Sequence, residues 1–299
     1  MSNIDLSYDK CNLCNRRCGA LRSRGEIGFC NSFDKPTVAR AALHFWEEPV
    51  ISGTNGSGAI FFSGCSLGCI YCQNKAISDG KNGTVVDEKR LAEIMLNLKV
   101  QGAHNVNFVT PTHFAPSIAL AVELARKSGF SLPVVYNTGS YDTVETIRAL
   151  SDTVNIYLPD YKYSRSKTAA EYSFAPDYPS SAILSIGEMV RQRPVPVINS
   201  GIMSSGVIVR ILLLPGHLAE AKLALSTVYQ RFGNSVFLSL MNQYTPMPNM
   251  KAPLDRCVTR EDYRSFVSYA EKIGVVNGFI QEFGTASESF IPSFDGSGT

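Results

Sequence analysis

The stretch AIFFSGCSLGCIYCQN, residues 59–74, joins an apolar run to three cysteines in the spacing C-x3-C-x2-C. A run that is apolar throughout is typical of a strand buried on both faces of a sheet. Cys65, Cys69 and Cys72 follow directly after it. A structural zinc and an ordinary iron–sulfur cube each take four protein ligands, so three cysteines leave one coordination position open. The sequence therefore predicts a reactive iron–sulfur cubane here. The alternative is a zinc ion completed by a distant ligand such as His104 or His113.

Short apolar runs alternate with helical patterns from Ala59 onward. We expect strands at 59–63, 105–110, 133–137, 154–158, 207–214, 236–240 and 278–283. We expect helices at 89–102, 117–129, 144–150, 181–192, 218–231 and 260–273, the last with Thr259 as its N-cap and Gly274 at its end. Alternation of this kind predicts a parallel sheet with right-handed crossovers.

The fold class that follows is α/β, a partial (β/α)6 TIM-like barrel with a short cysteine-rich N-terminal segment. We expect an irregular metal-binding segment over 1–57, the barrel over 58–284 and a flexible tail over 285–299. In a barrel the active site lies at the carboxyl ends of the strands, which is where the three cysteines fall.

Composition excludes several classes of protein. The 299 residues are 44% hydrophobic and 18% charged, with a formal net charge of +2. This small charge argues against nucleic acid as a partner. No apolar run approaches the ~18 residues of a membrane span, and the N-terminus does not resemble a signal peptide. We therefore expect a cytoplasmic protein that does not bind membranes.

A second cysteine group lies in the N-terminal segment. Cys11, Cys14, Cys18 and Cys30 form the pattern C-x2-C-x3-C-x11-C. Clustered cysteines in a reducing compartment indicate metal ligands rather than disulfides. Four ligands suggest a closed site that holds either zinc or a [4Fe–4S] cluster, and the spacing leaves both open. Cys257 stands alone and is interpreted as a bystander thiol.

The cysteine loop, with Tyr71 before its last cysteine, resembles the signature of radical S-adenosylmethionine enzymes. Further stretches narrow the resemblance to a subgroup related to pyruvate formate-lyase activating enzyme: RAALHFWEEPVISGTNGSGAIFFSGC, TPTHF, VVYNTGSYD, IYLPDYKY, IVRILLLPG and NQYTP, together with the N-terminal CNLCNRRCGALRSRGEIGFC. The resemblance covers about Cys11 to Phe283.

The resemblance implies an oxidoreductase whose [4Fe–4S] cluster binds S-adenosylmethionine at its open iron. Reductive cleavage then gives a 5′-deoxyadenosyl radical that abstracts hydrogen from a substrate. It also implies anaerobic chemistry and an electron donor such as flavodoxin or ferredoxin. The substrate is a glycine of a partner enzyme, as in the activating relatives, or a peptide or small metabolite; no residue decides between them.

Site residues are carried over from the resemblance position by position. Relatives end their second strand in Gly-Gly-Glu, where this chain has Thr110-Pro111-Thr112-His113; without the carboxylate, Thr110 and Thr112 are expected to bind the methionine amino group. Asn137 and Thr138 replace an Asp-Thr pair that helps to bind a monovalent cation, and Asp160 would complete that cation site. Lys162 would pair with the methionine carboxylate.

Four further residues are weaker assignments. Arg210 matches an arginine that approaches the carboxylate or ribose, or it forms a salt bridge in the core. Gln243 and the backbone of Tyr71 are expected near adenine. His113 is a base, a ligand or a packed residue. The HFWEEP stretch, residues 44–49, lines the substrate cleft or packs the N-terminal segment against the barrel.

Two rival functions remain at this stage. A non-catalytic iron–sulfur electron-transfer module would explain the cysteines but not the polar residues at the strand ends. An RNA-modifying radical enzyme would need a basic face, against which the near-neutral charge argues.

Overall fold

The computed structural model describes residues 6–282 and 292–299. Within these ranges one ten-stranded sheet runs in the order β10-β9-β8-β6-β5-β4-β2-β1-β3, with β7 paired to β8. The strands are β1 (Thr37–His44), β2 (Ser57–Phe62), β3 (Thr84–Val85), β4 (Val106–Val109), β5 (Val134–Thr138), β6 (Ile156–Pro159), β7 (Val197–Asn199), β8 (Ile202–Leu212), β9 (Phe237–Met241) and β10 (Gly278–Ile280). The sheet is mostly parallel and does not close, as in a partial TIM barrel, which confirms the predicted fold class.

The helices between the strands follow the predicted pattern. They are α1 (Pro49–Ser52), α2 (Lys75–Ser78), α3 (Glu88–Val100), α4 (Ala115–Lys127), α5 (Val144–Ala149), α6 (Ser166–Ser173), α7 (Tyr178–Gln192), α8 (Leu218–Phe232) and α9 (Arg260–Ile273). Helix α9 begins where Thr259 accepts a hydrogen bond from the Asp262 backbone and ends at Gly274 in the left-handed region, as expected. Helix α6 and the short α1 and α2 were not predicted.

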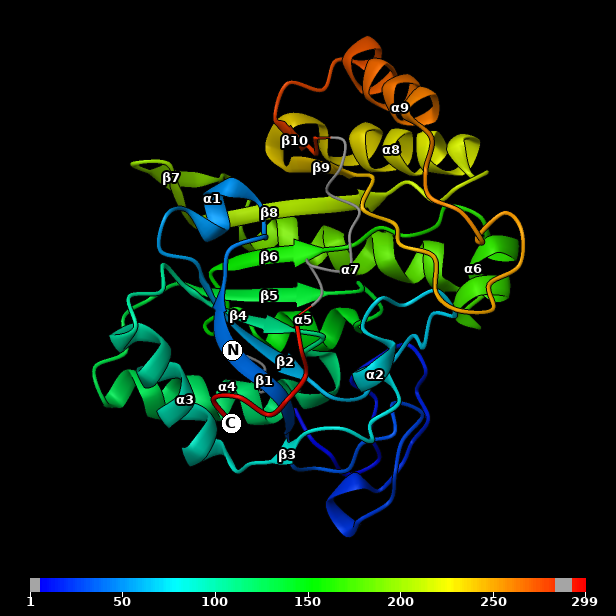
Figure 1. The fold of residues 1–299 in the computed structure, drawn as a ribbon. Helices are drawn as coiled ribbons and strands as arrows, with labels where there is room; N and C mark the ends of the chain where they lie inside the picture. Colours follow the sequence, from blue (N-terminus) through cyan, green and yellow to red (C-terminus); the bar gives the residue numbers. More distant parts are fainter. Residues whose placement is uncertain (1–5, 283–291) are drawn as a thin grey trace.

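The central strands are buried along their whole length. Every residue of β2, β4, β5 and β6 is buried. Phe62 and Phe108 stack at 5.9 Å between β2 and β4, and burying each such side chain stabilises the fold by about 1.5–3 kcal/mol. The core therefore fixes where the parallel strands end. Figure 1 shows β5, β6 and β8 pointing toward the side where α2 and the N-terminal segment lie.

Two expectations for the ends of the chain need correction. The segment 1–57 is not irregular throughout, because β1 is an eight-residue strand that pairs antiparallel with β2. In its sequence, TVARAALH, apolar and polar residues alternate too weakly to indicate a strand, and the strand is recognised only by its pairing with β2. Residues 292–299, expected to be flexible, pack on β1, where Gly296 donates to the Ala39 carbonyl and Ala41 to the Ser297 carbonyl. The expected strand residue Phe283 and residues 285–291 of the tail lie outside the described residues.

Three 3-10 turns complete the described elements, η1 (Arg22–Arg24), η2 (Thr112–Phe114) and η3 (Gly233–Ser235). Among the described helices, none is both long enough and apolar enough to cross a membrane. The division into an N-terminal segment, a barrel and a tail stays a prediction.

Candidate active site

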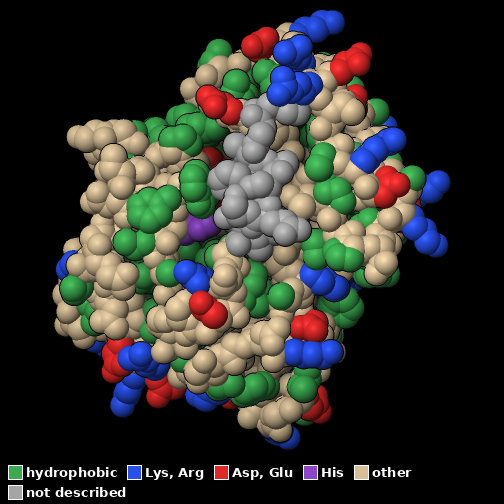
Figure 2. Space-filling model, viewed as in Figure 1, with side chains coloured by type: hydrophobic (Ala, Val, Ile, Leu, Met, Phe, Trp, Pro, Cys, Tyr) green, Lys and Arg blue, Asp and Glu red, His purple; other side chains and the backbone are tan. Residues whose placement is uncertain are grey.

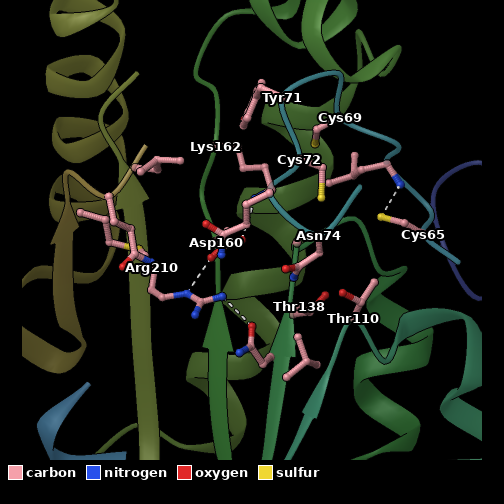
Figure 3. Close-up of a pocket in the computed structure, with 18 of the residues that line it drawn as sticks. Cys65, Cys69, Tyr71, Cys72, Asn74, Thr110, Thr138, Asp160, Lys162 and Arg210 are labelled. Carbon is pink, nitrogen blue, oxygen red and sulfur yellow. Dashed lines mark hydrogen bonds and ion pairs between the residues drawn. The ribbon is translucent and has the colours of Figure 1, made fainter. Parts of the chain in front are cut away.

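A pocket lies at the carboxyl ends of the parallel strands and encloses about 1070 Å³ of atom-free space, part of it open to solvent. The loop between β2 and α2 forms one wall with Cys65, Cys69 and Cys72, all free thiols. Figure 3 shows these three side chains around one end of the pocket. The Leu67 backbone donates to Cys65 Sγ over 3.4 Å. Burial, and then the neighbouring Cys69 and Cys65, raise the pKa of Cys72 to about 12, so the free thiol of Cys72 stays protonated unless a metal ion binds it.

The opposite wall consists of charged side chains from the segment directly after β6 and from β8. Lys162 Nζ donates to Asp160 Oδ2 over 2.6 Å, and Arg210 Nε donates to Asp160 Oδ1 over 2.7 Å. Burial acts to lower the pKa of Lys162, but Asp160 and then Cys69 outweigh it and leave the pKa raised. Lys162 is therefore a fixed positive charge directed toward the cysteine wall.

Arg210 also contacts two residues on other elements. Its Nη2 donates to Asn137 Oδ1 over 2.5 Å, and its Nη1 lies 3.3 Å from Glu47 Oε2. Asn137 and Asp160, which the sequence resemblance assigns to a cation site, are thus joined by a guanidinium group. Arg210 forms the expected salt bridge, with Asp160, and it also lines the pocket; its approach to a cofactor carboxylate or ribose stays a prediction.

Glu47 shows how the HFWEEP stretch is used. Glu47 Oε1 accepts hydrogen bonds from Asn107 Nδ2 (3.0 Å) and Asn137 Nδ2 (3.3 Å), so it fills the interior of the sheet beneath Arg210. No residue of the stretch is among those lining the pocket. Trp46 is 61% exposed on the outside. Of the two interpretations of residues 44–49, packing against the barrel agrees with these contacts, and lining of the pocket does not.

Most other predicted site residues also line the pocket: Tyr71, Thr110, Thr138 and Gln243. Thr110 has a φ of 58°, a strained conformation for a β-branched residue, which a backbone hydrogen bond from its N–H to the Asn137 carbonyl helps to hold. Thr112 does not line the pocket; its hydroxyl lies 3.2 Å from Thr138 Oγ1 behind the wall. Gln243 Oε1 accepts from Gln281 Nε2 over 2.9 Å.

His113 lies behind the cysteine loop and not in the pocket. Its Nε2 is 2.9 Å from the Ser63 carbonyl oxygen. Burial first, and Arg22 second, lower its pKa to about 3. His113 is therefore neutral and packed against the strand that leads to Cys65.

Sequence reasoning missed several residues of the site. Gln73 and Asn74 line the pocket directly after the last cysteine. Behind the wall, Asp142 accepts from Thr138 Oγ1 over 2.5 Å and from the Tyr136 hydroxyl over 2.8 Å. Ser173 Oγ donates to Cys69 Sγ over 2.9 Å. Gln73 and Asn74 could have been found by their proximity to Cys72, but Ser173 carries no local signal because it belongs to a separate helix.

Cys11, Cys14, Cys18 and Cys30 lie outside this pocket, in the segment that packs beside its cysteine wall. In the part of the chain that the structure describes, no group of three or more His, Cys, Asp or Glu side chains is close enough together to hold a single metal ion.

Comparison with known proteins agrees with this geometry. A family model described as the radical SAM superfamily matches residues 59–220. A protein of Methanocaldococcus jannaschii described as "Uncharacterized protein MJ0674" is 27% identical over 276 residues, covering 89% of this chain and 75% of its own length.

Two solved structures share the fold at low sequence identity. HydG, a maturase of the [FeFe]-hydrogenase, is 15% identical with a TM-score of 0.53, over 79% of this chain and 53% of its own. The anSMEcpe structure with bound AdoMet and the Kp18Cys peptide is 12% identical with a TM-score of 0.51, over 72% of this chain and 60% of its own. The chain therefore spans about half to three fifths of the length of these proteins.

Proposed function

This chain belongs to the radical SAM superfamily, and we propose that it uses a [4Fe–4S] cluster and S-adenosylmethionine to abstract a hydrogen atom from a peptide or protein substrate. The family implies both cofactors. Bound together, they supply one-electron chemistry that ends in hydrogen-atom abstraction. The observation that best supports this proposal is that Cys65, Cys69 and Cys72 line the same pocket as Lys162.

The residues of the pocket fit such a cluster. Three thiols line it, and no histidine or fourth cysteine is among the lining residues of the described chain. The nearest carboxylate on the opposite wall, Asp160, is already bonded to Lys162 and Arg210. Three thiolates would hold three irons, and the fourth iron would be left for the cofactor. A hydrogen bond from Ser173 to Cys69 Sγ stabilises the thiolate form.

The methionine end of the cofactor would bind between the two walls. Lys162 supplies a positive charge for its carboxylate. Asn74 Oδ1 is buried and, among the described residues, has no hydrogen-bond partner. A buried acceptor without a donor costs about 1–3 kcal/mol, and an ammonium group would satisfy it. Asn74 and Thr110 therefore replace the glutamate that the relatives use. Figure 3 labels Asn74 beside Cys72 and near Thr110 and Thr138.

Arg210 takes the role of the monovalent cation that the activating-enzyme resemblance implies. Its guanidinium is bonded to the same two residues, Asn137 and Asp160, that would otherwise hold the ion. Because the guanidinium group of Arg210 is part of the protein, its positive charge already balances the oxygens of Asn137 and Asp160 without a bound ion. The hydroxyls of Thr138 and Thr112 contact each other next to Asn137, and Asp142 orients Thr138 by accepting its hydrogen bond.

The adenine end would lie near Tyr71, which packs edge-on against Tyr172 and Tyr244 at ring distances of 6.2 Å. The Tyr163 hydroxyl donates to the Tyr71 hydroxyl over 2.8 Å, which holds the ring of Tyr71 in place beside the pocket. Gln243 is held by Gln281 on the same side.

The substrate is proposed as a peptide or a glycine-bearing loop of a partner enzyme, as in activating enzymes. The pocket is partly open to solvent, so an extended segment can enter it. Similarity of fold to anSMEcpe, whose structure holds a peptide, is consistent with this class. A one-electron donor such as flavodoxin or ferredoxin is needed. On the face in Figure 2, Lys and Arg are interspersed with Asp and Glu, which does not favour RNA.

The proposal is tested by measuring 5′-deoxyadenosine after anaerobic reconstitution with iron and sulfide. We expect dithionite and S-adenosylmethionine to give the product with the unaltered protein, and Cys69→Ala to abolish it. Cys257→Ala is the matched control, because Cys257 is exposed and outside the pocket. Product formation by Cys69→Ala at the unaltered rate would reject the cluster assignment. An alternative, non-catalytic electron transfer, predicts no product from either protein.

A further inference from the structure

We propose that the outer edge of β1, the edge that faces away from β2, is a docking site for an extended segment of a partner protein. Residues 292–299 of this chain occupy the edge and show the chemistry that it selects. The pattern is an aromatic residue, then an acidic residue, then a glycine three positions later, as in Phe294, Asp295 and Gly298. The proposal does not depend on the proposed function, because binding at this edge needs neither the cluster nor S-adenosylmethionine.

The outer edge of β1 has backbone groups that another strand does not cover. On one side β1 pairs with β2, and on the other side β3 pairs only with the first two residues of β1. Beyond them, the Ala41 N–H donates to the Ser297 carbonyl oxygen over 2.9 Å, and the Gly296 N–H donates to the Ala39 carbonyl oxygen over 3.1 Å. Figure 1 shows this segment in red beside β1. Backbone bonds to a sheet edge are the means by which extended peptides bind such edges.

Phe294 places an aromatic ring in an apolar site next to the edge. Its ring centroid lies 5.6 Å from that of Phe61, in an edge-on arrangement. The ring packs against a cluster of five buried side chains: Ala39, Ala59, Phe61, Ile77 and Val109. Val109 also lines the active-site pocket. The aromatic residue of a bound segment would therefore lie against the wall of that pocket.

Arg40 binds the acidic residue that follows the aromatic one. Arg40 Nη1 donates to Asp295 Oδ1 over 3.1 Å and to the Ser293 carbonyl oxygen over 2.8 Å. The Asp295 side chain is more than half exposed, so this ion pair adds little to the stability of the fold. A charge at the rim of a binding site instead selects partners of the opposite sign.

The Ala41 carbonyl group requires a glycine in the bound segment. Gly298 has a φ of 77°, and a Cβ there would overlap the Ala41 carbonyl oxygen. Gly296 has nearly the same φ, 75°, but a Cβ there would meet only Thr299 Oγ1, at 3.9 Å. Both positions favour glycine through their backbone conformation. Only Gly298 is selected by contact with β1.

The composition of the segment favours exchangeable binding over permanent packing. Phe294 is the one apolar side chain in SFDGSGT, residues 293–299, so hydrophobic burial does little to hold the segment. Ordering a glycine-rich segment costs conformational entropy. What holds it is mainly its linkage to the rest of the chain, which gives it a high effective concentration at the edge. A partner segment with the same pattern can therefore take its place.

A hollow beside β1 leaves room for a longer segment. It encloses about 490 Å³ of atom-free space, part of it open to solvent. Arg40 and Phe61, which contact the segment, line the hollow together with Leu43 and His44 from the far end of β1. The site that holds residues 292–299 therefore continues along the strand.

The docking site is tested with a fluorescein-labelled SFDGSGT peptide and the full chain. The variant Phe294→Ala/Gly298→Ala weakens the chain's own segment, so we expect it to bind the peptide at least tenfold more tightly than the unaltered protein does. Fluorescence anisotropy measures both affinities, and circular dichroism checks the fold. Asp295→Ala/Gly298→Ala takes the place of the first variant if that variant does not fold. Equal affinities, or no binding to the folded variant, would overturn the proposal.

Altered peptides test the pattern. We expect the peptide with Gly298→Ala to bind the variant at least tenfold more weakly than the peptide with Gly296→Ala, because both changes carry the same backbone cost and only the first meets the Ala41 carbonyl oxygen. Arg40→Gln in the protein should abolish the preference for the unaltered peptide over its Asp295→Asn form. Equal binding of the two glycine-substituted peptides would overturn the proposal. Failure of the proposed function is distinguishable, because it would leave peptide binding unchanged.

Discussion

Arg210 Nε donates to Asp160 Oδ1 over 2.7 Å at the carboxyl end of the sheet. The pair is partly buried and shares its charges with two neighbours: Lys162 bonds the other carboxylate oxygen, and Glu47 lies 3.3 Å from the guanidinium. Removing one partner is unfavourable, because it leaves a partly buried charge without its counter-charge. The charged residues on this wall of the pocket therefore form one connected network, in which each side chain depends on its neighbours.

This relationship predicts that the protein does not need a monovalent cation. We expect the Kd for S-adenosylmethionine to stay the same when K⁺ and Na⁺ are replaced by tetramethylammonium at equal ionic strength. Arg210→Ala should weaken binding at least tenfold and make it depend on added K⁺ or guanidinium ion. Isothermal titration calorimetry measures both, with the exposed Arg256→Ala as control. A cation requirement in the unaltered protein would contradict the role given to Arg210.

Lys162 is predicted to bind the carboxylate of S-adenosylmethionine. Lys162→Met keeps the length of the side chain but removes its charge, so we expect the Kd to rise about tenfold, or about 1.4 kcal/mol. Lys167→Met is the control, since Lys167 is exposed on α6. Equal affinities for the two variants would show that Lys162 serves only to balance Asp160.

Asp160 predicts how stability depends on pH. Burial acts to raise its pKa, but Arg210 and then Lys162 outweigh burial and leave the pKa below its usual value. A depressed folded-state pKa adds stability above the unfolded pKa of about 3.9, and this stability is lost as the pH falls through the folded pKa.

The corresponding experiment compares the free energy of unfolding of the unaltered protein and Asp160→Asn from pH 7 to pH 2.5. We expect a constant difference above about pH 5 that narrows below about pH 4. A difference that stays the same across the whole range would mean that the ionisation of Asp160 does not contribute.

Gly64 is predicted to be irreplaceable where the two cysteine groups meet. Its φ is 91°, and a Cβ there would lie 2.5 Å from the Cys30 carbonyl oxygen. Gly102 has the same φ with nothing within 4 Å, so Gly102→Ala isolates the backbone strain. We expect Gly102→Ala to cost about 1 kcal/mol and Gly64→Ala to cost about 1–3 kcal/mol more. Chemical denaturation measures both, and equal losses would mean that the contact with Cys30 relaxes freely.

Local patterns predicted most of the barrel. Strands β2, β4, β5 and β6 are buried on both faces, and burial of this kind appears in the sequence as continuous apolar runs. The resemblance to the activating-enzyme subgroup, and not the apolar pattern, then supplied Asn137 and Asp160 as site residues near the ends of β5 and β6. Strand β1 was missed, since its weak pattern becomes a strand only through pairing with β2.

Contacts between distant elements could not be predicted. Ser173 is 104 residues from Cys69, and Glu47 is 163 residues from Arg210. Neither pair has a spacing that a sequence motif could record, because the topology of the sheet brings them together. The same applies to Arg16, whose hydrogen bonds to the Ser66 and Leu67 carbonyls link the two cysteine groups.

The most direct test of the account is electron paramagnetic resonance of the anaerobically reconstituted and reduced Cys11→Ser/Cys14→Ser variant, before and after S-adenosylmethionine is added. This variant lacks two of the four N-terminal cysteines and keeps Cys65, Cys69 and Cys72, so a [4Fe–4S] signal from it is assigned to the three-cysteine loop. We predict a [4Fe–4S] signal whose shape changes when the cofactor binds the open iron. An unchanged signal, with binding absent by calorimetry, would contradict the central claim that these three cysteines form an open, cofactor-binding site.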